Sequence, residues 1–131
     1  MKLLLDTNIF LWAFGWPARL SATVRTALEN PDNQLFLSAI SPWEILVKHG
    51  KGKLQINTGG VPIEKFLITQ REALGIESLP VTEAMAFQLL KLPPIHGDPF
   101  DRLLICQAIA DGLTLVTPDA HISRYPIRTL W

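Results

Sequence analysis

The sequence predicts an α/β sandwich with a mostly parallel central sheet. Two features of the 131-residue chain support this fold class. Short apolar runs alternate with stretches in which apolar residues recur at helical spacing, and the connections between them are too short to form a separate domain. Strands that alternate with helices favour parallel pairing, with the helices covering the sheet.

Turn and capping residues set the expected limits of each element. Ser21 and Thr82 are typical helix N-caps, Pro62 and Pro99 suit the start of a helix, and Pro93 suits its end. The expected strands cover residues 2–5, 34–37, 76–79, 113–117 and, at an edge of the sheet, 126–131. The expected helices cover residues 9–14, 22–28, 42–49, 62–74, 82–90 and 99–111.

Composition and charge exclude several classes of protein. Twelve basic and twelve acidic residues give a net charge of zero, which argues against a protein that coats polyanions in general. The apolar runs fall short of the ~20 residues that a membrane span requires, and no signal peptide is recognised. We therefore expect a cytoplasmic protein without a membrane partner. The lone Cys106 leaves no intrachain disulfide.

Several acids stand where elements begin or end at one edge of the expected sheet. They are Asp6, Glu44, Asp98, Asp101 and Asp119. The carboxyl ends of parallel strands share an edge, and right-handed crossovers bring them to one crevice. We therefore expect these carboxylates to form a shared site.

Some of these acids also have a purely structural explanation. Glu44 lies three residues after Ser41, which is the spacing of a capping box, and Asp101 has the same spacing from Asp98. Asp119 could be an ordinary turn residue. Capping alone would explain Glu44 and Asp101, so each of these alternatives stays open.

Asp6 is the acid that a capping role explains least, because the adjacent Thr7 and Asn8 could cap the helix without it. Carboxylates that lie close together raise one another's pKa. A hard divalent cation relieves this repulsion, and Mg²⁺ or Mn²⁺ suits such oxygen ligands. Carboxylates with a divalent ion indicate phosphoryl chemistry.

Other kinds of site lack support in the sequence. The three histidines, His49, His96 and His121, are far apart and do not have the spacing of a zinc site. No glycine-rich phosphate loop and no convincing Ser-His-Asp pattern is present.

Four segments carry a resemblance to a known family. They are Leu3–Asn8, Ser41–Ile45, His96–Leu104 and Thr117–Asp119. In this order and at this spacing they resemble the successive motifs of PIN domains, and more narrowly those of the VapC-type toxins of bacterial toxin-antitoxin systems. The resemblance implies a three-layer α/β/α PIN-like fold, with a central sheet of about five strands and a single domain over residues 1–131.

The resemblance also implies an activity and a site. The activity is that of a Mg²⁺-dependent endoribonuclease, with Mn²⁺ able to replace Mg²⁺. Asp6 and Asp101 would be the principal metal ligands, and Glu44 and Asp119 would complete the catalytic quartet. The hydroxyls of Thr7 and Thr117 would support the acids, and Asp98 is either a helix cap or a further ligand.

Basic residues that could contact RNA lie in two places. Relatives often carry a basic residue where this chain has Gly97, so we expect the contact to come from Arg102 or from Lys48, Lys51 and Lys53. Each has a structural alternative. Arg102 could pair with an acid on its own helix, and the lysines could mark an ordinary helix end.

The expected partners are an RNA substrate, a small VapB-like antitoxin and a second copy of the chain in a homodimer, all implied by the resemblance. Two other functions remain as alternatives. One is a non-catalytic PIN-like interaction or scaffold protein. The other is a phosphatase with Asp6 as the nucleophile, although its second acid is normally two residues further on, where this chain has Asn8.

Overall fold

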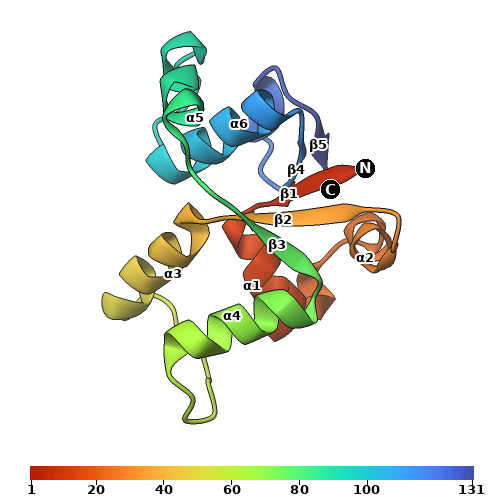
Figure 1. The fold of residues 1–131 in the computed structure, drawn as a ribbon, viewed down its shortest axis with the longest axis vertical. Coiled ribbons are helices and arrows are strands. Elements are labelled where there is room, and N and C mark those ends of the chain that lie inside the picture. Colours follow the sequence, from red (N-terminus) through yellow and green to blue (C-terminus); the bar gives the residue numbers. More distant parts are fainter.

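The computed structural model describes all residues from 1 to 131 and contains one five-stranded sheet. The strands are β1 (Lys2–Leu5), β2 (Gln34–Ser38), β3 (Ile76–Leu79), β4 (Thr114–Val116) and β5 (Thr129–Leu130). Their order is β3-β2-β1-β4-β5, and every pairing is parallel. The predicted sheet of about five strands is therefore confirmed, with β1 at its centre (Figure 1).

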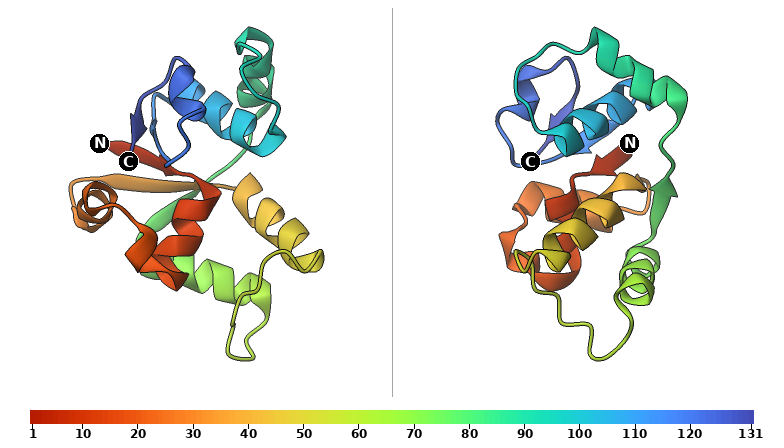
Figure 2. Two further views of the ribbon diagram at one scale, coloured as in Figure 1. Left: turned by 180° about the vertical axis from the view of Figure 1, so that it is seen from behind. Right: turned by 90° about the vertical axis from the view of Figure 1, so that its left-hand side faces the viewer.

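Helices cover both faces of this sheet. They are α1 (Thr7–Gly15), α2 (Ala22–Glu29), α3 (Ile40–Gly50), α4 (Ile63–Ala73), α5 (Glu83–Phe87) and α6 (Pro99–Asp111), with short 3₁₀ helices η1 (Pro17–Arg19), η2 (Gln88–Lys91) and η3 (Ile122–Arg124). Figure 2 shows α1 and α4 on one side of the sheet and α5 and α6 on the other. This is the three-layer α/β/α arrangement. None of the helices has the length and apolar character needed to cross a membrane.

The central strand joins two hydrophobic cores. Leu3 and Leu5 pack into the core beneath α1, α2 and α4, whereas Leu4 points to the opposite core beneath α5 and α6. All three side chains are fully buried. Successive residues of a strand face opposite sides, so a strand covered on both faces reads as an unbroken apolar run. The Leu-Leu-Leu run before Asp6 has this origin.

The start of α3 differs from the prediction. The helix begins at Ile40 rather than Pro42, and Ser38 Oγ accepts a hydrogen bond from Ile40 N at 3.1 Å. Ser41 lies inside the first turn, where its buried Oγ accepts a hydrogen bond from Thr7 at 2.9 Å. The capping box of Ser41 and Glu44 is therefore wrong. Pro42 is tolerated because an N–H in the first turn has no partner within the helix.

The stretch expected to form one helix over residues 82–90 is divided. Thr82 caps it as predicted, since its Oγ1 accepts a hydrogen bond from Met85 N. The α-helical part ends at Phe87, and η2 continues the turn to Lys91. Pro93 and the proline after it then prevent the chain from continuing as a helix.

Candidate metal centre

Asp6 lies buried at the carboxyl end of the central strand. One carboxylate oxygen, Oδ1, accepts a hydrogen bond from Asn8 N at 2.8 Å, so Asp6 is the N-cap of α1. The view that the neighbouring polar residues would make an acidic cap unnecessary is wrong, because the extended backbone of Asp6 places its own carboxylate over the first turn. The other oxygen, Oδ2, accepts a 2.7 Å hydrogen bond from Thr117 Oγ1.

Glu44 projects from α3 and is also buried. Its Oε2 accepts a 2.7 Å hydrogen bond from Lys48 Nζ, one helical turn further along. Burial alone would lower the pKa of Lys48, but the hydrogen bond and charge of Glu44, with the charges of Asp98 and Asp101, raise it. Lys48 therefore compensates part of the negative charge at this edge of the sheet.

Asp98 and Asp101 stand at the start of α6. Asp98 is exposed, and its Oδ1 accepts hydrogen bonds from Phe100 N at 2.9 Å and from Asp101 N at 3.1 Å. It is thus the N-cap of α6. Of the two roles considered for Asp98, the helix cap is the one that the structure shows. Asp101 is half-buried, and its own carboxylate does not cap the helix.

Asp119 is placed by a tight turn after β4. Thr117 Oγ1 accepts a hydrogen bond from Asp119 N at 3.2 Å, and Asp119 Oδ1 accepts one from His121 N at 2.9 Å. Asp119 is therefore a turn residue, which is the structural alternative given for it. This role does not remove Asp119 from the site, because ligand atoms of Asp119, Asp101 and His96 all lie within 4.8 Å of one another.

The charges of other acids of the expected quartet act on Asp6 and on Asp101. Burial raises the pKa of Asp6, hydrogen bonds from Thr117 and Asn8 oppose this, and the charges of Glu44 and Asp119 add to it. Burial raises the pKa of Asp101 to about 6, with contributions from the charges of Asp98, Asp6 and Glu44. The structure thus brings together carboxylates from β1, α3, α6 and the loop after β4.

The donor set fits a hard divalent cation. Two buried carboxylates, Asp6 and Glu44, and two half-buried ones, Asp101 and Asp119, offer oxygen ligands that repel one another without a counter-charge. Mg²⁺ and Mn²⁺ prefer such ligands. The only thiol, Cys106, is buried among apolar side chains of the core beneath α5 and α6.

Two further residues of this site, His96 and Tyr125, are not predicted from the sequence. His96 Nε2 lies 3.4 Å from Asp101 Oδ2, and His96 Nδ1 lies 2.7 Å from the hydroxyl of Tyr125. The sequence spacing of the histidines does not suit zinc, but in the fold the rings of His96 and His121 stack with centroids 6.4 Å apart. The available signal for His96 was its place in the His-Gly-Asp-Pro-Phe-Asp segment. Tyr125 had no signal.

The residues expected to contact RNA differ in their surroundings. Arg102 Nη1 donates to Pro93 O, His96 O and the Tyr125 hydroxyl at 3.0 to 3.2 Å, so this side chain holds the loop before α6. Lys51 and Lys53 lie just after α3, are exposed and form no ion pair. The two exposed lysines, unlike Arg102, therefore have no structural contact that would hold them away from a phosphate.

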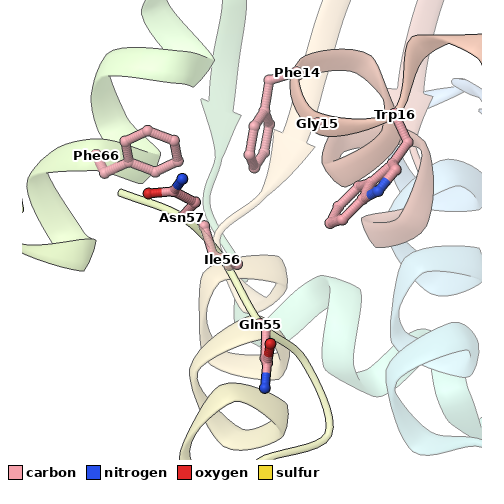
Figure 3. Close-up of a pocket in the computed structure, with 7 residues that line it drawn as sticks. All are labelled: Phe14, Gly15, Trp16, Gln55, Ile56, Asn57 and Phe66. Atoms are coloured by element: carbon pink, nitrogen blue, oxygen red, sulfur yellow. The ribbon is translucent and has the colours of Figure 1, made fainter. Parts of the chain in front are cut away.

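The largest hollow on the surface lies away from the acids. It has a volume of about 530 Å³ and is lined by Phe14, Gly15, Trp16, Gln55, Ile56, Asn57 and Phe66. Figure 3 shows the rings of Phe14 and Trp16 at the end of α1 and that of Phe66 on α4, with the segment that follows α3 passing beside them. Its aromatic and amide lining holds no acid, so it is separate from the candidate metal centre.

An all-parallel three-layer sandwich with four acids gathered beside its central strand is the architecture of the PIN domain. The PIN domain family matches residues 3–127, and the chain belongs to this family. Within the family it is similar to Ribonuclease VapC22 of Mycobacterium tuberculosis, with 32% identity over 120 residues that cover 91% of this chain and 88% of the relative.

Solved structures share the fold. VapBC2 from Rickettsia felis, bound to a DNA fragment from their promoter, matches with a TM-score of 0.72 and 20% identity, covering 99% of this chain and 98% of that one. A toxin-antitoxin complex from Klebsiella pneumoniae matches with a TM-score of 0.56 and 21% identity, covering 89% and 86% of the two chains. At this identity the likeness establishes the arrangement of the elements.

Proposed function

We propose that this protein is a metal-dependent endoribonuclease that hydrolyses RNA phosphodiester bonds and serves as the toxin of a toxin-antitoxin pair. The observation that carries the proposal is the proximity of Asp6 and Asp101, two acids from distant parts of the chain: burial, and then the charges of Asp98 and Asp6, raise the pKa of Asp101. A relative that is 32% identical over most of the chain is a ribonuclease by name, which supports the same activity.

The residues divide into two groups in this proposal. Asp6 and Asp101 hold the ion, and Glu44 and Asp119 complete the pocket. Mg²⁺ is the ion proposed, with Mn²⁺ able to use the same ligands. When bound, a divalent ion polarises the phosphodiester and makes a water molecule more acidic. Thr117 keeps Asp6 in place through its 2.7 Å hydrogen bond, and Asn8 N holds the other oxygen of Asp6.

Further contacts follow from the charges and apolar surfaces. Lys51 and Lys53 are the proposed contacts to the RNA backbone. An antitoxin is the proposed protein partner, since the solved relatives include VapBC2 and a toxin-antitoxin complex. A second copy of the chain would cover exposed apolar side chains on α5 and η2, namely Phe87, Leu89 and Leu90. We place the protein in the cytoplasm, where its RNA substrate occurs.

The test is cleavage of a defined RNA by purified protein with Mg²⁺, with Mn²⁺ and with a chelator. We expect cleavage only with a metal, and its loss in Asp6→Asn and in Asp101→Asn. Asp111→Asn is the matched control, because Asp111 is an exposed acid at the other end of α6. Sequencing the fragment ends identifies the cleavage site.

Other outcomes would replace the proposal. Undiminished cleavage by both variants would show that these acids do not form the catalytic site. Turnover of a phosphomonoester with a phosphorylated Asp6 would indicate a phosphatase. Tight binding of a partner without any metal-dependent cleavage would indicate an interaction protein.

A further inference from the structure

The environment of His96 is more restrictive than that of an ordinary loop histidine. Three contacts join it to Tyr125 and to Arg102 of α6, and a fourth joins these two residues to each other. The Tyr125 hydroxyl lies 2.7 Å from His96 Nδ1 and 3.1 Å from His96 N, and Arg102 Nη1 lies 3.1 Å from that hydroxyl and 3.2 Å from His96 O. Tyr125 itself is buried.

The hydrogen bonds around the Tyr125 hydroxyl determine which atom accepts its hydrogen. A phenol oxygen donates one hydrogen bond and accepts two. The two accepted bonds come from His96 N and Arg102 Nη1, which are groups that can only donate. The phenol hydrogen must therefore be donated. It has two acceptors in reach, His96 Nδ1 at 2.7 Å and His96 O at 3.4 Å, and the shorter contact is the stronger.

The hydrogen bond from Tyr125 also determines which nitrogen of the neutral His96 imidazole carries the hydrogen. An Nδ1 atom that accepts from Tyr125 carries no hydrogen, so the hydrogen is on Nε2. Nε2 lies 3.4 Å from Asp101 Oδ2 and donates to it. The opposite tautomer would require the Tyr125 oxygen to accept three hydrogen bonds and to donate across 3.4 Å instead.

We propose that Tyr125 and Arg102 hold His96 as the Nε2–H tautomer, so that His96 positions Asp101 and is not itself a metal ligand. The inference rests on the proposed function, in which Asp101 holds the ion. The competing arrangement is a site of His96, Asp101 and Asp119, whose ligand atoms lie within 4.8 Å of one another. A hydrogen on Nε2 removes the lone pair that this arrangement needs, and it leaves the site with oxygen donors only.

The decisive measurement is the tautomer of His96, read from long-range ¹H–¹⁵N spectra of the labelled protein with and without Mg²⁺. The His96→Gln variant identifies the His96 signals by their loss. We expect the Nε2–H tautomer in both states. An Nδ1–H tautomer, or an Nε2 signal shifted by direct metal coordination, would overturn the inference. This readout uses the unaltered protein and needs no activity.

Substitutions then test whether the tautomer matters for the site. Tyr125→Phe removes only the hydroxyl, and we expect a mixture of tautomers and Mg²⁺ binding weaker by about 10- to 100-fold in calorimetry. The matched control is Thr69→Val, which removes an exposed hydroxyl on α4 that bonds only to Lys65 O. A Tyr125→Phe variant with the tautomer and Mg²⁺ affinity of the wild type would refute the positioning role.

A conservative replacement separates positioning from packing. The amide of His96→Gln can still donate to Asp101, whereas His96→Leu cannot. We expect Mg²⁺ affinity to be retained within a few-fold in the first and to fall about 10-fold or more in the second. Equal losses would contradict the role as a donor. If wild-type protein cleaves no RNA, the proposed function fails while the tautomer and binding results still decide this inference.

Discussion

Thr117 Oγ1 donates a 2.7 Å hydrogen bond to Asp6 Oδ2 and so joins the loop after β4 to the end of β1. The same hydroxyl oxygen accepts from Asp119 N. One buried threonine thus connects two of the four acids. Because this hydrogen bond lowers the pKa of Asp6 against the effect of burial, Thr117 favours the ionised form that a metal ligand requires.

Removing this hydroxyl should impair the site without unfolding the protein. In Thr117→Val the isosteric side chain keeps the packing, but Asp6 retains only its bond to Asn8 N. We expect RNA cleavage to fall by about 10- to 100-fold, as is typical when a group that orients a metal ligand is lost. Thr117→Ser restores the hydroxyl and should restore most of the rate. Steady-state kinetics with melting temperatures measures both, and an equally impaired Thr117→Ser would point to packing instead.

The raised pKa of Asp101 predicts how stability depends on pH in the metal-free protein. Its carboxyl shifts from 3.8 to about 6 on folding, so between these values the folded state binds more protons than the unfolded state. The contribution of Asp101 to the free energy of unfolding therefore falls as the pH rises through that window, and it stays low at higher pH. Asp6 contributes in the same direction.

Asp101→Asn removes one titrating group and should flatten this profile. At roughly 1.4 kcal/mol for each unit of pKa shift, the full shift corresponds to about 3 kcal/mol. Because Asp101 is only half-buried, solvent screening reduces this, and we expect the variant to be more stable than the wild type above pH 6 by about 1–2 kcal/mol. Urea unfolding at a series of pH values in a chelator measures the difference. The same decline in Asp101→Asn as in the wild type would show that another group is responsible. Asp111→Asn, at an exposed position, should retain the wild-type profile.

Metal binding should stabilise the folded protein. An ion that binds only the folded state adds about 2.7 kcal/mol at one hundred times its Kd. We expect the melting temperature of the wild type to rise with Mg²⁺ concentration, and the rise to disappear in Asp6→Asn and Asp101→Asn. Thermal scans with and without Mg²⁺ provide the measurement. A rise of equal size in both variants would place the ion elsewhere.

The lysines after α3 should contribute to RNA binding through charge alone. Lys51 and Lys53 are exposed and unpaired. We expect Lys51→Ala and Lys53→Ala each to weaken binding across RNA sequences and to reduce the salt slope by about one. Binding curves at several salt concentrations, recorded in the inactive Asp101→Asn background, test this. An unchanged slope would exclude a phosphate contact at either position.

Lys48 should behave differently from these two lysines. Its ammonium pairs with the buried Glu44 at 2.7 Å, so Lys48→Met leaves that carboxylate without its partner. We expect a lower melting temperature for Lys48→Met and little change for Lys51→Met. If Lys48→Met instead keeps its stability and lowers the salt slope, Lys48 belongs to the RNA contact.

Much of the fold could be predicted because its determinants are local. The Leu-Leu-Leu run of β1, the caps Ser21 and Thr82, and Gly112 after α6 act within a few residues of their position. The start of α3 cannot be predicted from local patterns because two serines could each serve as its cap. Ser38 holds the first turn, while Ser41 bonds to Thr7 from another element, which local patterns do not show.

The acids of the site could be named from sequence, but their contacts could not. Glu44 and Lys48 stand four residues apart on one helix, so their pairing was in principle predictable. The contact between His96 and Tyr125 spans 29 residues. It depends on how the end of η3 packs against the loop before α6, and Tyr125 belongs to none of the sequence motifs. Contacts of this kind follow from tertiary structure alone.

The bond between Asp6 and Thr117 joins residues 111 positions apart in the chain. Strand β4, which ends at the residue before Thr117, pairs with β1 in the same sheet. A growing polypeptide therefore carries Asp6 and Glu44 well before Asp101, Thr117 and Asp119 have been added. Because a chain is made from its N-terminus, this order of synthesis delays the assembly of the four acids until residues 117–119 have been added.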